Sequence, residues 1–280
     1  MSDERSEPRS RNAEPRRVSV TVDNGVADVR LNRADKLNAL DAAMFQALTE
    51  TGSELALDPS LRAVVLSGEG RGFCAGLDVG SFGALGKAAD GGPKLLERPA
   101  GRIATNAQLA AHVWSELPVP VIAALHGVTF GGGLQIALAA DIRLVTPDAR
   151  LSVMEIKWGL IPDMTGSQTL RRLVRLDVAK ELTFTGRIVS GREAVELGLA
   201  TRVSDDPRAD ALEMARDIAG RSPDAIRTGK RLLDESALVD VETGLRLEAE
   251  LQGELIGSAN QIETVKANLE KRVPNFRDPE

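Results

Sequence analysis

The chain has 280 residues and a net charge of −6, with 42% hydrophobic and 27% charged residues, values ordinary for a globular protein. The negative charge argues against a non-specific nucleic-acid-binding or anionic-membrane surface. One cysteine, Cys74, excludes an internal disulfide framework, and two histidines leave little for a metal site. No apolar run approaches the roughly 20 residues that cross a bilayer. We expect a cytoplasmic protein without a metal that binds neither nucleic acid nor membrane.

The chain divides into three regions by composition. Residues 1–17 are polar, carry four acids and lack an apolar stretch, so we expect a disordered tail. Residues 18–205 alternate short strand-like and helical segments, which predicts an α/β core. Residues 206–280 carry helical periodicity, which predicts a C-terminal helical region.

Apolar runs and alternation predict strands, and apolar periods near 3.6 residues predict helices. In chain order we expect strands at 18–22 and 26–31, a helix at 38–57, a strand at 63–67, a helix at 103–117, a strand at 121–125, a helix at 132–140, strands at 142–145 and 151–153, and a helix at 168–176. Further helices are expected at 190–197, from 222 to about 233, and from 241 to about 269. Glycine-rich residues 79–101 predict a mobile surface segment that closes over a ligand.

The most informative stretch is residues 121–141, VIAALHGVTFGGGLQIALAAD. Its apolar start predicts a strand buried on both faces, and three glycines, 131 to 133, then open an apolar helix. Glycines allow close approach to the backbone, and a helix start leaves N–H groups unpaired with a partial positive charge. Such a site stabilises a developing oxyanion, which indicates an enzyme.

A second glycine-rich loop covers residues 68–78, GEGRGFCAGLD. Gly70, Gly72 and Ala75 have the spacing of a dinucleotide-binding fingerprint, which requires a helix to start there. The glycines that follow between positions 76 and 86 would break that helix. We therefore interpret the loop as a turn that exposes backbone N–H groups.

Four segments together resemble the crotonase superfamily, the enoyl-CoA hydratase/isomerase family. They are LNRADKLNAL (31–40), GRGFCAGLD (70–78), PVIAALHGVTFGGGLQIALAADIRL (120–144) and MEIKWGLIPDMTGSQTLRRL (154–173). The resemblance implies an α/β, ClpP/crotonase-like fold, a spiral of ββα units with a C-terminal helical trimerisation region. It also implies an acyl-CoA substrate, no separate cofactor, and a homotrimer or a hexamer made of two trimers.

The resemblance also implies the positions of the binding site. The family's oxyanion hole corresponds to the backbone N–H groups of Leu77 and Gly132, which would hold the thioester oxygen as an enolate develops. Further residues are expected to line the path of the acyl-CoA or contact its phosphates: Arg33, Lys36, Ala75, Gly76, Asp78, Gly131 and Gln135.

The acids at the site decide the reaction. Family hydratases carry two glutamates, and this chain has Gln135 at the first position and Glu155 at the second. Apolar neighbours of Glu155 predict a raised pKa, useful for moving a proton. Asp163 matches an aspartate of dienoyl-CoA isomerases, although those enzymes usually also carry an acid at the position of Gln135. Alternatively, Asp163 caps a helix that begins near Gly166.

One carboxylate suffices to shuttle a proton along an acyl chain, whereas hydration needs one group to activate water and another to deliver a proton. We therefore expect isomerisation of a 3-enoyl- or 3,5-dienoyl-CoA, with Glu155 and Asp163 as the catalytic residues. Two alternatives stay open. One is an enoyl-CoA hydratase in which Gln135 positions a water, and the other is a catalytically reduced acyl-CoA-binding protein.

Overall fold

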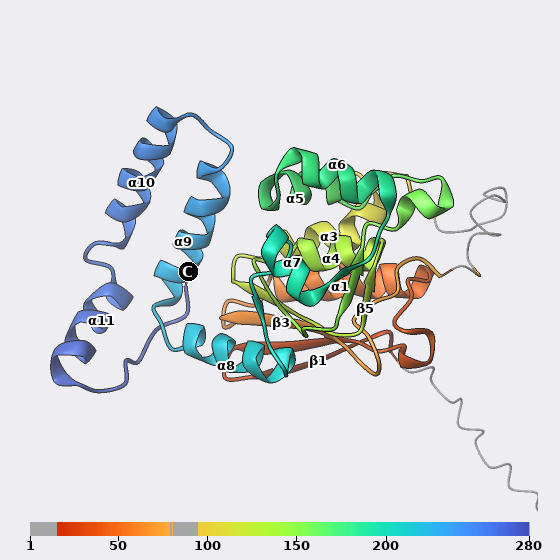
Figure 1. Cartoon of the computed structure of the whole chain (residues 1–280). Helices are drawn as coiled ribbons and strands as arrows, with labels where there is room; N and C mark the ends of the chain where they lie inside the picture. Colours follow the sequence, from red (N-terminus) through yellow and green to blue (C-terminus); the bar gives the residue numbers. More distant parts are fainter. Residues whose placement is uncertain (1–15, 79, 81–94, 280) are drawn as a thin grey trace, which may run out of the picture.

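The computed structural model describes residues 16–78, 80 and 95–279 (Figure 1). The expected disordered tail therefore lies almost wholly outside the described residues, as does most of the expected mobile segment at 79–101. The description below concerns the described residues alone.

A six-stranded sheet forms the centre of the chain, in the order β1-β2-β3-β4-β6-β9. Its strands are β1 (Val18–Asp23), β2 (Val26–Leu31), β3 (Ala63–Gly68), β4 (Val121–Leu125), β6 (Ile142–Val145) and β9 (Arg202–Val203). The first two pair antiparallel as the predicted hairpin, and every later pair is parallel. The central strands β3 and β4 are buried along almost their whole length, as their unbroken apolar sequence predicts.

A second, three-stranded sheet consists of β5 (Val128–Phe130), β7 (Arg150–Ser152) and β8 (Val189–Ser190). Strands β5 and β8 were not predicted, because two or three residues are too few for a periodic signal. Strand β5 pairs with β7 in parallel, and an isolated bridge joins Thr129 to Cys74 in the glycine-rich loop. This small sheet thereby brings that loop to the start of the helix that follows Phe130.

Helices cover both faces of the large sheet. The described helices are α1 (Ala42–Leu55), α3 (Asn106–Ser115), α4 (Gly132–Leu138), α5 (Gly166–Leu173), α6 (Leu176–Thr185), α7 (Gly191–Leu197), α8 (Pro207–Ala219), α9 (Pro223–Ser236), α10 (Val241–Leu255) and α11 (Ala259–Glu270), with short 3-10 helices η1 (Ala34–Lys36) and η3 (Glu155–Trp158). One core cluster joins the sheet to α1, α3 and α4, and a smaller one joins the opposite face to α8. None of the described helices is long and apolar enough to span a membrane.

Two predicted helix boundaries are wrong for identifiable reasons. The helix expected from residue 38 begins at Ala42, because Asn38 has φ +55° and its buried amide donates to three carbonyls of the glycine-rich loop. The long helix expected from 241 to 269 is two helices, α10 and α11, separated at Gly257, which has φ +82°. Apolar periodicity continues across both interruptions and therefore conceals them.

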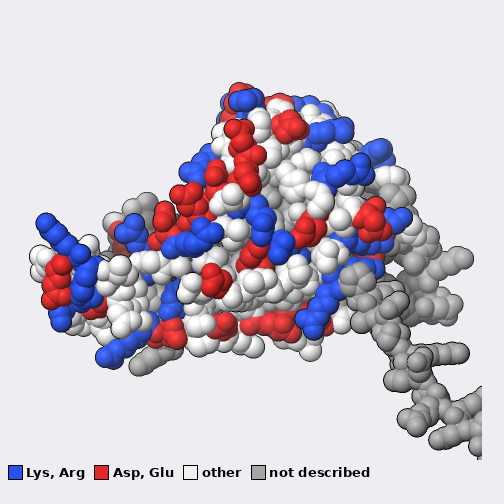
Figure 2. Space-filling model, turned by 90° about the horizontal axis from the view of Figure 1, so that it is seen from below, with Lys and Arg blue, Asp and Glu red and all other residues white. Residues whose placement is uncertain are grey.

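The last three helices stand to one side of the sheet (Figure 1). Lys230 in α9 attaches them to the core, since its ammonium donates to the carbonyl of Val119 at 3.1 Å and pairs with Asp141 at 2.8 Å. Seen from below, basic and acidic side chains are intermixed over the described surface (Figure 2). That face therefore presents no extended field of one sign to attract a polyanion.

Candidate active site

Two glycines bring the two glycine-rich loops into direct contact. Gly76 has φ +86°, and a Cβ there would lie 2.7 Å from the carbonyl oxygen of Phe130 and 3.7 Å from the Cα of Gly131. Gly131 has φ +52° and ψ −123°, a conformation closed to residues with a side chain. The next residues along the two loops, Leu77 and Gly132, therefore lie at one corner of the molecule.

Leu40 holds the two sides of this corner together. Its N–H donates to the carbonyl of Gly76 at 2.8 Å, its carbonyl accepts from Asp78 at 3.0 Å, and its side chain lies 2.9 Å from where a Cβ on Gly132 would stand. Within the described part of the chain, the N–H groups of Leu77 and Gly132 donate to no protein acceptor. Two unpaired amides at one corner make Leu77 and Gly132 the candidate oxyanion hole.

Glu155 is the first residue of η3 and is 8% exposed. Its Oε1 accepts a hydrogen bond of 2.5 Å from Nε2 of Gln135, whereas its Oε2 is buried and has no partner among the described residues. A Cβ on Gly131 would lie 3.4 Å from Oε1, so the carboxylate stands beside the glycine that precedes the amide of Gly132. One oxygen of the carboxylate is thus held, and the other is free to exchange a proton.

Desolvation by burial raises the pKa of Glu155, as the sequence predicts in direction. The backbone N–H of Glu155 itself opposes this shift most, the hydrogen bond from Gln135 opposes it next, and the nearby charge of Asp163 adds to it. The burial has a different origin from the one expected, because Ile156 and Trp158 are exposed and the carboxylate faces Gln135 instead. A buried carboxylate of raised pKa is a general base suited to operation near neutral pH.

Asp163 lies close enough to Glu155 for its charge to raise the pKa of that residue. The side chain of Asp163 is exposed to solvent, and partial desolvation raises the pKa of Asp163 as well. The alternative role as a helix cap is wrong: the N-cap of α5 is Thr165, and the N–H of Gly166 donates to Oε1 of Gln135. The structure therefore brings both predicted acids together and frees Asp163 of a capping role.

The other predicted binding residues surround the Leu77 side of this corner. Arg33 donates to Asp78 at 2.7 Å and lies 3.4 Å from Asp41, so two carboxylates already neutralise its guanidinium. Lys36 is exposed, and its charge helps to lower the pKa of Asp78, after the larger effect of the Arg33 hydrogen bond. The N–H of Ala75 is used by a bond to the carbonyl of Leu37. Contacts of these residues with an acyl-CoA stay predictions.

Cys74 and His126 each contact a backbone carbonyl of a neighbouring segment. Cys74 is buried beneath α4, its thiol donates to the carbonyl of Asn38, and burial raises its pKa to about 12. His126 Nε2 lies 3.0 Å from the carbonyl oxygen of Gly70. Loop 68–78 contains no helix, which is incompatible with the dinucleotide-binding interpretation. Because it is buried and its pKa is raised, Cys74 is not available as a nucleophile.

Sequence reasoning missed Met164. Its sulfur would lie 2.8 Å from a Cβ on Gly132, so it packs beside one amide of the candidate oxyanion hole. The one signal in the sequence that could have indicated a site role for Met164 is its position next to Asp163 in the motif, because a methionine gives no periodic or chemical signal of its own.

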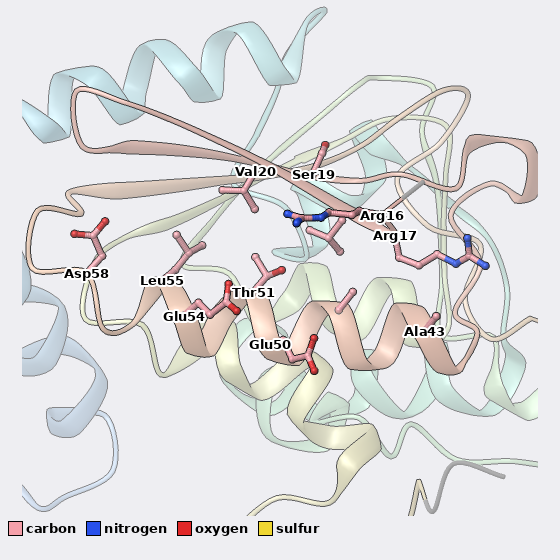
Figure 3. A pocket seen from close by; sticks show the side chains of 12 residues that line it. Arg16, Arg17, Ser19, Val20, Ala43, Glu50, Thr51, Glu54, Leu55 and Asp58 are labelled. Carbon is pink, nitrogen blue, oxygen red and sulfur yellow. The ribbon is translucent and has the colours of Figure 1, made fainter. Parts of the chain in front are cut away.

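A cavity of about 810 Å³ lies elsewhere, between β1 and α1 (Figure 3). Its walls carry Arg16 and Arg17 on one side and Glu50, Glu54 and Asp58 on the other, and none of them belongs to the site described above. The chain before Arg16 lies outside the described residues, so this cavity supports no functional assignment.

Comparison with known proteins agrees with the geometry. The profile of the enoyl-CoA hydratase/isomerase family matches residues 21–279. The chain is 34% identical over 264 residues to "Probable enoyl-CoA hydratase" of Bacillus subtilis, covering 93% of this chain and 98% of that protein. It is 31% identical to human mitochondrial methylglutaconyl-CoA hydratase, covering 90% of this chain and 74% of that protein.

Solved structures show the same fold. The crystal structure of an enoyl-CoA hydratase from Bacillus anthracis superposes with a TM-score of 0.83 at 30% identity, covering 94% of this chain and all (100%) of that one. An enoyl-CoA hydratase from Mycobacterium smegmatis superposes with a TM-score of 0.79 at 32% identity, covering 94% and 99% of the two chains. The fold is the crotonase fold, and the chain is an enzyme of the enoyl-CoA hydratase/isomerase family, in the crotonase superfamily.

Proposed function

We propose that the enzyme isomerises the double bond of a 3-enoyl- or 3,5-dienoyl-CoA, with Glu155 as the proton shuttle. One observation carries this proposal: a single buried carboxylate has one oxygen held by Gln135 and the other without a partner. Oε2 would remove a proton from the acyl chain while the amides of Leu77 and Gly132 bind the enolate oxygen. The same oxygen would then return the proton at the far end of the allylic system, so no second acid and no cofactor is needed.

Gln135 is poorly suited to activate a water. Its carbonyl oxygen already accepts from the N–H groups of Met164 at 2.7 Å and Gly166 at 2.9 Å. Its amide nitrogen can only donate and so cannot take a proton from water. Position 135 therefore lacks the carboxylate that family hydratases carry there.

Hydration of a 2-enoyl-CoA is the second candidate. It is favoured by the names of the relatives, several of which are hydratases, and by Asp163, whose pKa is raised beside Glu155. In that mechanism Asp163 would take the place of the missing glutamate.

Product analysis on a panel of 2-enoyl-, 3-enoyl- and 3,5-dienoyl-CoA thioesters separates the two candidates. We expect migration of the double bond in a 3-enoyl or dienoyl substrate to exceed hydration of the 2-enoyl substrate by at least about tenfold. Glu155→Gln should abolish both. Rapid hydration with no migration would overturn the isomerase assignment and support the Glu155–Asp163 hydratase.

We also propose that the C-terminal helices form the contacts of a trimer, or of a hexamer of two trimers. The described surface of α10 and α11 carries exposed apolar side chains, at Val241, Leu245, Ile262, Val265 and Leu269. Exposed apolar side chains that gather on neighbouring helices are typical of protein–protein interfaces. Leu269→Glu should lower the mass measured by light scattering, and an unchanged mass would place the interface elsewhere. The cytoplasmic location stays a prediction.

A further inference from the structure

Gln135 makes three hydrogen bonds that join three parts of the site. It projects from α4 and is 3% exposed. Oε1 accepts from the N–H groups of Met164 and Gly166, and Nε2 donates to Oε1 of Glu155. Because two N–H donors face Oε1 and a carboxylate faces Nε2, the orientation of this amide is determined by its partners.

Few side chains could replace this amide. An ionised glutamate would satisfy the two N–H groups, but its second oxygen would then stand about 2.5 Å from Oε1 of Glu155, so the pair would have to share a proton. An apolar residue would leave two buried N–H groups and one carboxylate oxygen without partners. Glutamine satisfies all three groups and adds no charge.

The hydrogen bond also distinguishes the two oxygens of Glu155. Oε1 is occupied, whereas Oε2 is buried without a partner. The turn that Gln135 holds includes Met164, whose sulfur packs beside Gly132. One side chain thus orients the base and positions the wall of the oxyanion corner.

We propose that Gln135 is a positioning residue that commits Oε1 of Glu155, so that Oε2 exchanges the proton, and holds the Met164–Gly166 turn against Gly132. This inference rests on the proposed function in assigning the proton transfer to Glu155. The sequence analysis expected Gln135 to contact the substrate. In this proposal Gln135 instead holds other residues of the protein in place.

The charged side chains near Glu155 determine how its pKa depends on its surroundings. Asp163 is the one charged side chain of the described residues that shifts its pKa. Helix α4 carries no charged residue. Other charged side chains on the elements packed nearby are Lys157 over the Trp158 ring, Arg171 and Arg172 on α5, and Lys180 on α6, together with Asp177 and Glu181, which pair with Arg175 and Arg187.

Gln135→Met tests the proposal, because methionine has a similar length and donates no hydrogen bond. Loss of the donor should raise the pKa of Glu155 further, so the acidic limb of the kcat profile should move upward by about one pH unit. Gln135→Glu keeps both N–H groups satisfied, guards against misfolding, and should move the limb upward as well. An acidic limb at the wild-type pH in Gln135→Met would overturn the proposal.

Asn260→Leu provides a matched control. Asn260 is a buried amide in α11 that also makes three hydrogen bonds, one of them to the carboxylate of Asp224. Its loss should reduce stability and leave the pH of the acidic limb unchanged. A shift equal to that of Gln135→Met would show that general loosening moves the limb, and would contradict a positioning role.

A direct titration keeps this test independent of turnover. The infrared C=O band of the protonated Glu155 carboxyl, identified by its absence from Glu155→Gln, can be followed against pH in the free enzyme. If no acyl-CoA is converted, the proposed function fails, whereas the band still reports whether Gln135→Met raises the pKa. An unchanged midpoint of that band would overturn the positioning role even in an active isomerase.

Discussion

Glu155→Gln should stabilise the protein near neutral pH while removing most of its activity. Burial raises the pKa of Glu155 above its ordinary value of 4.5, so the folded state binds this proton more tightly than the unfolded state. The stability that this group contributes is fully present below the unfolded pKa and is lost as the pH rises through the folded pKa. Above that pH, the folded protein carries a buried carboxylate whose Oε2 has no partner.

Glutamine at position 155 removes this charge. Its carbonyl oxygen can accept from Gln135 Nε2 as Oε1 does now, and its NH2 group takes the place of Oε2. An unpaired neutral donor there replaces an unpaired charge, which costs more to bury. Each unit of difference between the folded and unfolded pKa corresponds to about 1.4 kcal/mol. We expect the free energy of unfolding of Glu155→Gln to exceed that of the wild type at pH 8, with the difference shrinking toward pH 5. Activity should fall by at least about 10²-fold.

Urea unfolding followed by circular dichroism at several pH values measures this difference. Protein concentration must be held constant, since association contributes to apparent stability. Glu213→Gln, on the exposed face of α8, controls for the exchange of a carboxylate for an amide. A Glu155→Gln protein less stable than the wild type at pH 8, or a difference independent of pH, would refute the reasoning.

Three further outcomes follow from the same geometry. Gly132→Val should lower kcat by about 10²–10³-fold, because its side chain would displace Met164 or Leu40 and tilt the amide, and near-normal turnover would place the thioester elsewhere. Asp163→Asn should leave the thermal midpoint almost unchanged, since Asp163 caps no helix, and a fall in activity close to that of Glu155→Gln would identify it as a catalytic partner. Cys74, whose pKa burial raises to about 12, should resist iodoacetamide at pH 8 in the native protein and react after unfolding in urea; fast native labelling would contradict its burial.

The sequence alone determined the parts of this protein that depend on local pattern. The apolar runs of β3 and β4 identify buried parallel strands, because a strand covered on both faces has no polar side. The two glycine-rich loops that contain Gly76 and Gly131 indicate the corner of the site, because glycines allow close approach to the backbone. Together with the later motif that contains Glu155, they were enough to indicate the family and the candidate residues.

Tertiary structure decided what depends on contacts between distant segments. The sequence places Gln135 at a family position but does not show that its amide is committed to Glu155, Met164 and Gly166. It likewise does not show that two carboxylates already neutralise Arg33. Hydrogen-bond partners and desolvation are set by which residues meet in space, and no local period encodes them. Gln135 and Glu155 are 20 positions apart, and Arg33 and Asp78 are 45 positions apart.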